Sequence, residues 1–302
     1  TDRSIIAWIG GGVSEAEAAS PSYSGGALYL EDSTTFTGSN LVFQENTAYN
    51  GGAMEITDGS SANLTDVTFE GNVASRAGGG LRASSSAEVN CDGCYFDSNE
   101  ADRGGAVDVS GESTFTDVGG TYTDNAATTQ DGGAIRVFTD GELSVSGAVF
   151  EGNESEQAGG AIYLYQPDEA VFISQTQFQN NGAATGDGGA IAADVMASVT
   201  VNECRFDDNT TSLGSGGAIA FGPVNPGHFL TVFESSFESN QAEDDGGAVF
   251  AEEGDSVSIE DSTFLRNRAP NGNGGAVQLD DNDEYTFRRV VFHGNTADLS
   301  GR

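Results

Sequence analysis

The sequence predicts an all-β fold, a parallel β-helix (a solenoid) of about ten coils, and three observations lead to it. A double glycine recurs along the chain with a period of 26 to 30 residues. An aromatic residue follows, eighteen residues later in eight of the ten repeats, and an asparagine stands three residues after the aromatic. Between these landmarks apolar and polar residues alternate with a period of two, which indicates strands with one buried face. A fixed period of this length is typical of a solenoid.

The compound signature occurs ten times. The double glycines begin at Gly25, Gly51, Gly78, Gly104, Gly132, Gly159, Gly188, Gly216, Gly246 and Gly274. The aromatic residues are Phe43, Phe69, Phe96, Tyr122, Phe150, Phe178, Phe206, Phe237, Phe264 and Phe292. The asparagines are Asn46, Asn72, Asn99, Asn125, Asn153, Asn181, Asn209, Asn240, Asn267 and Asn295.

Three short strands are predicted in each repeat. The first strand follows the double glycine, and its apolar residues, such as Met54 and Ile56, are expected to face the core. Residues between the apolar positions are mostly polar and are expected to face outward; they are Tyr29, Glu55, Arg82, Asp108, Arg136 and Gln278. A second strand contains pairs such as Leu143 and Val145, and the third contains the aromatic residue. Helical repeats conflict with this alternation and with a double glycine in every unit.

Each repeated residue has an expected mechanical role. The paired glycines are predicted at a bend with unusual φ, where a side chain would clash with the next coil. The aromatic residues are predicted to stack as an internal ladder. The asparagines are predicted to stack at a bend, each amide bonding to the backbone of its own turn and to the neighbouring amides. We therefore expect these columns to be structural rather than functional.

The charge of the chain restricts its partners. There are 47 acidic residues against 11 basic ones, all arginine, and the formal net charge is −36. Such a surface repels nucleic acid and anionic lipid. No apolar run approaches the roughly 18 residues of a membrane span. The composition fits an extracellular or cell-surface protein, a protein from a high-salt habitat, or a calcium-loaded matrix protein.

The chain divides into two regions. Residues 1–24 lack the repeat and are predicted to form an N-terminal cap or a strand exchanged with a neighbouring subunit, because terminal repeats of solenoids are atypical. Residues 25–302 contain the β-helix repeats. The last repeat ends at Arg302 without a polar cap. The sequence is therefore interpreted either as part of a longer protein or as a subunit that stacks end to end with itself.

Two groups of residues are candidates for chemistry. Asp280, Asp281, Asp283 and Glu284 form an acidic turn that is either a solvated loop or a weak Ca²⁺ site. No other cofactor is predicted. Cys91 and Cys94 form a Cys-x-x-Cys pair on inward positions, interpreted either as buried thiols or as a local disulfide.

Three sequences match the glycosylation acceptor Asn-x-Ser/Thr. Asn153 and Asn209 belong to the internal asparagine column and are expected to be inaccessible. Asn63 is the remaining candidate acceptor.

The pair of signatures, Gly-Gly-Ala followed by Ile, Leu or Val and then Phe-x-x-Asn, resembles the repeats of chlamydial polymorphic outer-membrane proteins and of the cell-surface proteins that share them. The resemblance covers residues 25–302. Gly80 in place of alanine and Tyr122 in place of phenylalanine are departures from it. It implies a right-handed β-helix displayed outside the cell, often as an adhesin, and it does not name a ligand.

The first functional hypothesis is therefore a non-enzymatic, adhesin-like surface module with a cell-surface or matrix ligand. The second is a subunit of an extracellular fibre that stacks head to tail. The third is a carbohydrate-active enzyme, since β-helices also host such sites. The third is disfavoured because the acids do not cluster on one strand face, lysine is absent, and His228 and His293 are remote from each other.

Overall fold

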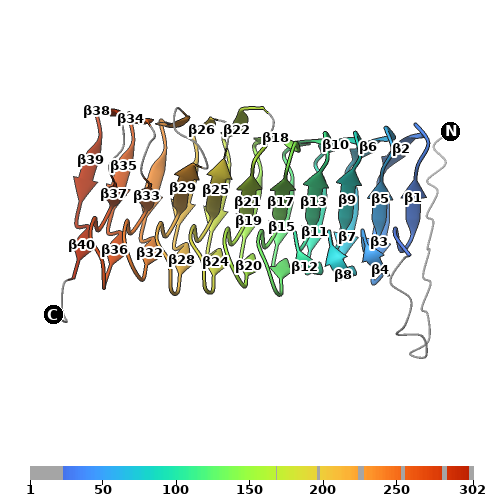
Figure 1. Ribbon diagram of the computed structural model, residues 1–302, viewed down its shortest axis with the longest axis horizontal. Helices are drawn as coiled ribbons and strands as arrows, with labels where there is room; N and C mark the ends of the chain where they lie inside the picture. The colour runs from blue at the N-terminus through green and yellow to red at the C-terminus, as the bar shows by residue number, and fades with distance from the viewer. Residues whose placement is uncertain are drawn as a thin grey trace.

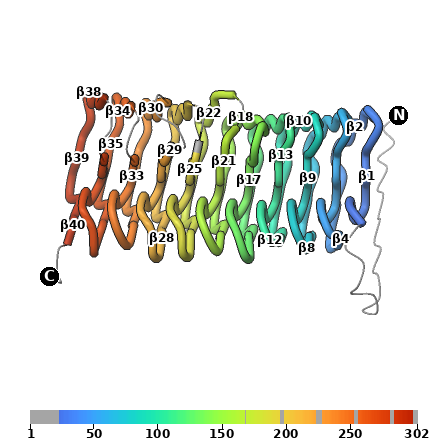
Figure 2. The backbone as a smooth tube through the Cα atoms, in the orientation of Figure 1, coloured from blue at the N-terminus to red at the C-terminus, as the bar shows by residue number. Residues whose placement is uncertain are grey.

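A computed structural model describes residues 23–167, 169–195, 198–223, 228–252, 256–280 and 284–298. The described residues form forty β-strands and no helix. The strands belong to four parallel sheets of ten strands each, so successive coils lie side by side in a rod, with the coils of β1 (Leu28–Leu30) and β37 (Val277–Leu279) at opposite tips (Figure 1). The winding of the chain is clearest in the backbone tube (Figure 2). The predicted parallel β-helix is confirmed.

The first two sheets follow the double glycine in each coil. The first sheet contains β1 (Leu28–Leu30), β5 (Met54–Ile56), β9 (Leu81–Ser84), β13 (Val107–Ser110), β17 (Ile135–Phe138), β21 (Ile162–Tyr165), β25 (Ile191–Val195), β29 (Ile219–Pro223), β33 (Val249–Ala251) and β37 (Val277–Leu279). The second contains β2 (Thr35–Ser39), β6 (Ser61–Thr65), β10 (Glu88–Asp92), β14 (Thr114–Val118), β18 (Glu142–Ser146), β22 (Val171–Ser174), β26 (Val199–Asn202), β30 (Phe229–Phe233), β34 (Ser256–Glu260) and β38 (Glu284–Arg288).

The third sheet contains the aromatic residues, and the fourth follows the asparagines. The third contains β3 (Val42–Gln44), β7 (Thr68–Glu70), β11 (Tyr95–Asp97), β15 (Thr121–Thr123), β19 (Val149–Glu151), β23 (Gln177–Gln179), β27 (Arg205–Asp207), β31 (Ser236–Glu238), β35 (Thr263–Leu265) and β39 (Val291–His293). The fourth contains β4 (Thr47–Asn50), β8 (Val73–Ala77), β12 (Glu100–Arg103), β16 (Ala126–Ala127), β20 (Glu154–Ser155), β24 (Gly182–Ala183), β28 (Thr210–Thr211), β32 (Gln241–Ala242), β36 (Arg268–Ala269) and β40 (Thr296–Ala297).

The fourth strand corrects the prediction of three strands per coil. Most strands of this sheet contain only two residues, such as Gly182–Ala183 and Thr210–Thr211. Two residues are too few to show an alternation of period two, so the sequence pattern contained no signal for them. They are recognisable only because each one pairs with its copy in the next coil.

The double glycines meet two different steric demands. Gly132 has φ +71°, a left-handed conformation that side chains rarely adopt. A Cβ on Gly133 would overlap the carbonyl oxygen of Gly160 in the next coil. The first glycine of the pair therefore permits the bend, and the second permits the close approach of two coils.

The aromatic residues form one stack inside the third sheet. Neighbouring rings, from Phe43 to Phe292, have centroids 4.4 to 5.1 Å apart. The spacing equals that of adjacent strands, about 4.8 Å. Identical rings in register thus fill the core without gaps.

The asparagines form a second internal column. The backbone N–H and the side-chain Nδ2 of Asn125 both donate to Oδ1 of Asn153, at 3.1 and 2.9 Å. Nδ2 of Asn125 also donates to the carbonyl oxygen of Phe96, one coil earlier, at 3.0 Å. The predicted bond to the backbone of the same turn is therefore wrong. The amide links three successive coils, because the strand spacing places the neighbouring coils within its reach.

The two ends of the described rod differ from its middle. The predicted cap falls almost wholly on residues 1–22, which lie outside the described residues. At the other tip, Tyr285, Phe287 and Phe292 are 44%, 42% and 49% exposed, although their register partners in the preceding coil are buried. The last described coil thus presents an apolar edge.

Candidate functional site

The outward side chains of the first sheet form a column in which the residue type changes from coil to coil. This outer column consists of the register partners Tyr29, Glu55, Arg82, Asp108, Arg136, Tyr163, Ala192, Ala220, Phe250 and Gln278. Its members from Glu55 to Arg136 are charged, whereas Ala192, Ala220 and Phe250 are small or apolar. Two residues that precede double glycines lie beside this column: Nε of Arg103 is 3.9 Å from Oδ2 of Asp108, and Asp131 interacts electrostatically with Arg136. The outer column therefore presents different chemistry along the rod.

The charged half alternates in sign along the rod. Arg82 forms an ion pair with Glu55, and its Nε lies 3.4 Å from Oδ1 of Asp108. Arg136 Nη1 donates to Oδ2 of Asp108 at 3.0 Å. Although these side chains point outward, Glu55, Asp108 and Arg136 are only 3%, 1% and 4% exposed. They pack against each other, and the Arg136 guanidinium lies 4.0 Å from the centre of the Phe138 ring. The outward orientation agrees with the sequence prediction, but the burial follows from these tertiary contacts.

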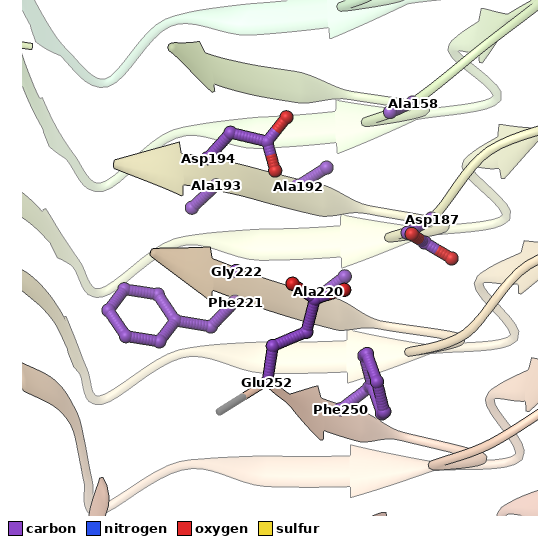
Figure 3. Close-up of a pocket in the computed structure, with 10 residues that line it drawn as sticks. All are labelled: Ala158, Asp187, Ala192, Ala193, Asp194, Ala220, Phe221, Gly222, Phe250 and Glu252. Atoms are coloured by element: carbon purple, nitrogen blue, oxygen red, sulfur yellow. The ribbon is translucent and has the colours of Figure 1, made fainter. Parts of the chain in front are cut away.

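The second half of the outer column contains an acidic hollow (Figure 3). It is lined by Ala158, Asp187, Ala192, Ala193, Asp194, Ala220, Phe221, Gly222, Phe250 and Glu252. The alanines leave space between three carboxylates: Asp187 precedes β25, Asp194 lies in β25, and Glu252 follows β33, two coils further along the rod. Its volume of about 50 Å³ is well below the roughly 300 to 1,000 Å³ of pockets that enclose a small molecule. The hollow has room for a water molecule or for one protruding group of a larger ligand.

The three carboxyl groups of the hollow have raised pKa values. Desolvation raises the pKa of Asp187, of Asp194 and of Glu252, and the neighbouring acidic groups raise each pKa further. The hydroxyl of Tyr163 donates to Oδ2 of Asp194 at 2.8 Å, and the backbone N–H of Ser215 donates to Oδ1 of Asp187 at 2.6 Å. These donors oppose the shifts but do not remove them. No arginine lines the hollow, so no basic side chain in its lining neutralises the three carboxylates.

A second group of polar residues lies inside the coil, where the sequence predicted buried thiols or a disulfide. Cys91 and Cys94 are free thiols and are buried. Burial, followed by the Cys94 thiol, raises the pKa of Cys91 well above its usual value. Asp117 is the register partner of Cys91 and is 1% exposed, and burial raises its pKa to about 7. Such thiols are poor nucleophiles, because a nucleophilic cysteine needs a stabilised thiolate.

Of the other predicted site residues, Asp280 lies beside the end of the outer column, where it accepts a hydrogen bond from Gln278. Asp280 and Glu284 are exposed, whereas Asp281 and Asp283 fall outside the described residues. Across the part of the chain that the structure describes, no three histidine, cysteine or acidic side chains are arranged to hold a metal. Asn63 is exposed on β6 and accepts a hydrogen bond from Asn90 at 3.2 Å. The glycosylation of Asn63 and the Ca²⁺ site therefore remain predictions.

The sequence reasoning missed the residues of the hollow. Asp187 precedes a double glycine, as do Arg103 and Asp131, and a repeat-by-repeat alignment of this position would have revealed its charges. The change from charged residues to Ala192 and Ala220 in the outer column was also visible. Asp194 and Glu252 share another position of the repeat, six residues after the first glycine, so the same alignment would have shown their charge but not their proximity to Asp187.

The geometry defines a parallel β-helix whose first sheet carries a variable outward column. Comparison with known proteins places the chain in a family. A family model described as a right-handed β-helix region matches residues 22–220 and 119–300. The chain therefore belongs to the right-handed β-helix family. No curated protein and no solved structure matches it. None of the described residues forms a helix able to cross a lipid bilayer. The narrower resemblance to polymorphic outer-membrane repeats stays a prediction.

Proposed function

We propose that this β-helix is a non-enzymatic, adhesin-like module that is displayed at or outside the cell surface and binds an extended ligand along its outer column. The observation that supports the proposal is the contrast between uniform inward columns and a variable outward one. Inward positions are constrained by stacking on their own copies. Variation along this outward column offers a ligand a series of different contacts along a rigid rod.

The shape of the hollow supports binding by surface contact. A volume of about 50 Å³ cannot enclose a substrate of ordinary size. It accepts one group of a ligand whose remainder lies along the neighbouring strands. A net charge of −36 keeps such a surface soluble and repels anionic partners, which favours a neutral or cationic ligand at the acidic half.

The test is a binding screen of the purified chain on arrays of glycans and matrix proteins. Ala220→Arg places a long cation in the hollow, and Thr200→Arg places the same side chain on the outward face of β26 in the second sheet. We expect a ligand whose binding is lost in A220R and retained in T200R. Equal binding by both variants would show that the ligand does not bind at the outer column.

A carbohydrate-active enzyme is the second candidate, and Asp194 and Glu252 favour it. Right-handed β-helices include pectate lyases and glycosidases, and glycosidases generally use two carboxyl groups. Both carboxylates lie near Gly222, where an added Cβ would be 3.5 Å from Asp194 Oδ1 and 3.1 Å from Glu252 Oε2. Release of reducing ends from a polysaccharide, abolished in Asp194→Asn and Glu252→Gln, would replace the adhesin proposal with this one.

A fibre subunit is the third candidate, and the exposed Phe287 and Phe292 at the last described coil favour it. Apolar side chains on a strand edge of this kind pair with a further coil, either of a longer chain or of a second molecule. Negative-stain electron microscopy across protein concentrations tests this directly. Filaments that vanish in Phe292→Glu, and persist in Val118→Glu on the side of the rod, would support stacking. Isolated rods at every concentration would contradict it.

A further inference from the structure

We propose that an arginine cluster beside the charged half of the outer column binds a single oxyanion group: a carboxylate, sulfate or phosphate. The cluster consists of Arg76, Arg82, Arg103 and Arg136, and it lies across β8, β9, β12 and β17 (Figure 1). This inference goes beyond the proposed function. It stands whether or not the chain is an adhesin.

Three guanidinium groups of the cluster converge on one carboxylate. Nη1 of Arg136, Nε of Arg82 and Nε of Arg103 lie 3.0, 3.4 and 3.9 Å from the oxygens of Asp108. Asp108 is 1% exposed, so water contributes little to its screening. One carboxylate therefore shares its charge among three cations, which is an unusual ratio for a protein with more than four times as many acids as bases.

The charges around the cluster do not balance. Arg82 is also paired with Glu55, and Asp131 interacts electrostatically with Arg136 while accepting a backbone hydrogen bond from Ala158. Arg82, Arg103 and Arg136 thus have Glu55, Asp108 and Asp131 as acidic partners, and Arg76 adds a fourth positive charge that repels Arg103. Burial lowers the pKa of Arg103, and repulsion from the other three arginines lowers it further, although Asp108 opposes this. An added negative charge would offset that repulsion.

Buried atoms of the arginine cluster also lack hydrogen-bond partners. Nε of Arg82, of Arg103 and of Arg136 is buried without a hydrogen-bond partner among the described residues, and so are two acceptors of the network, Oε2 of Glu55 and Oδ1 of Asp108. Arg136 itself is only 4% exposed, so bulk water does not compensate its Nε–H group. A buried donor without an acceptor is costly, and it is more costly when it is charged. An oxyanion at the edge of the cluster would draw the guanidinium groups together around several acceptors.

A ligand has access to the cluster from outside. The side chains of Arg82 and Arg103 are 17% and 18% exposed. Arg76 is exposed, with its guanidinium 5.8 Å from the centre of the Tyr49 ring. Planar guanidinium groups match carboxylate, sulfate and phosphate oxygens in pairs. The strongly acidic remainder of the rod repels a long polyanion, which restricts the ligand to one anionic group.

The other described arginines provide the contrast. Arg205, Arg266, Arg268, Arg288 and Arg289 each pair with an acidic residue and are 50 to 60% exposed. Each already has a counter-charge and free access to water. They are therefore suitable positions for control substitutions.

The test is equilibrium dialysis of the purified chain against radiolabelled sulfate and phosphate and a labelled carboxylate, galacturonate. Ionic strength is held constant with sodium chloride, because any salt screens so acidic a protein. We expect saturable binding of at least one probe at one site per chain. Binding should weaken at least about tenfold in Arg103→Gln, since hydrogen bonds to charged groups are strong. Arg266→Gln should bind like the wild type. The preferred probe identifies the group.

Thermal unfolding at constant ionic strength provides the second readout. In the absence of the oxyanion, R103Q should melt at or above the wild-type temperature because it removes repulsion. It should also lose the rise in melting temperature that the bound probe produces in the wild type and in R266Q. If R103Q does not fold, Arg76→Gln on the exposed member of the cluster answers the same question. Absence of saturable binding, or equal binding by wild type and the cluster variants, would reduce the cluster to an internal ion network.

Discussion

The inward and outward faces of the first sheet are made by alternate residues of the same strands, yet they follow opposite rules. Inward residues such as Val107 and Ile135 repeat from coil to coil, whereas the outward partners Asp108 and Arg136 change sign. Apolar side chains and amides stack favourably on their own copies at about 4.8 Å. Like charges at that spacing repel. Stacking therefore favours repetition inside the rod, whereas the charges of the outer column alternate in sign.

The largest predicted loss of stability comes from a substitution at a close backbone contact between two coils. Gly133→Ala places a Cβ against the carbonyl oxygen of Gly160 and the backbone of Glu154. Neither is able to move without opening the coil, so we expect a loss of more than about 4 kcal/mol in the free energy of unfolding, or no folding. Gly182→Ala is the matched control, because its Cβ would meet Thr210 at ordinary distances of 3.8 and 3.9 Å. Chemical denaturation distinguishes the two, and equal losses would contradict the steric account.

The second prediction removes one amide from the asparagine column. Asn153→Ala leaves the N–H groups of Asn125 and the carbonyl oxygen of Tyr122 without their partners. Several buried groups are left unpaired at once, so we expect a loss of about 3 to 4 kcal/mol in the free energy of unfolding. The exposed Asn63→Ala should cost less than about 0.5 kcal/mol. A similar cost for both variants in urea denaturation would show that the column is dispensable.

The third prediction concerns Asp117, an inward residue that breaks the inward rule. Its register partners Cys91 and Val145 are apolar or weakly polar. Because the pKa is about 7 in the folded chain against 3.8 ordinarily, the folded state holds its proton more tightly than the unfolded state. This contribution to stability is fully present below about pH 4 and is lost as the pH rises through 7, with a total on the order of 4 kcal/mol.

Asp117→Val should therefore raise the free energy of unfolding at pH 8 by roughly 3 to 4 kcal/mol relative to the wild type. The difference should shrink as the pH falls from 7 to 4. Glu112→Gln, on an exposed position of the same coil, controls for the general loss of acidic charge. If D117V and E112Q have the same pH dependence in denaturation experiments, Asp117 does not titrate inside the core.

The smallest effect is expected on the outward face. Ala220→Arg adds a cation to a hollow lined by three carboxylates and removes no stacking contact of the core. We expect the free energy of unfolding to change by no more than about 1 kcal/mol. Thermal unfolding beside T200R checks this. A collapse of stability in A220R alone would show that the outer column supports the fold as strictly as the inward columns do.

The sequence by itself determined the coil period, the aromatic and asparagine columns and the glycine bends. It did so because each of these residues contacts its own copy one coil away, so the same residue type recurs once in every repeat of the sequence. It also determined that Glu55, Arg82, Asp108 and Arg136 share one outward column.

Only the tertiary structure decided the features that join different positions of the repeat. The two-residue strands of the fourth sheet exist through pairing with their neighbours, and each asparagine amide bonds to the coils before and after its own. Arg103 and Arg136 come from different sheets, and Glu252 lies two coils further along the rod than Asp194. Their proximity depends on how the chain closes each turn and on where neighbouring coils place them, and no spacing along the chain records that geometry.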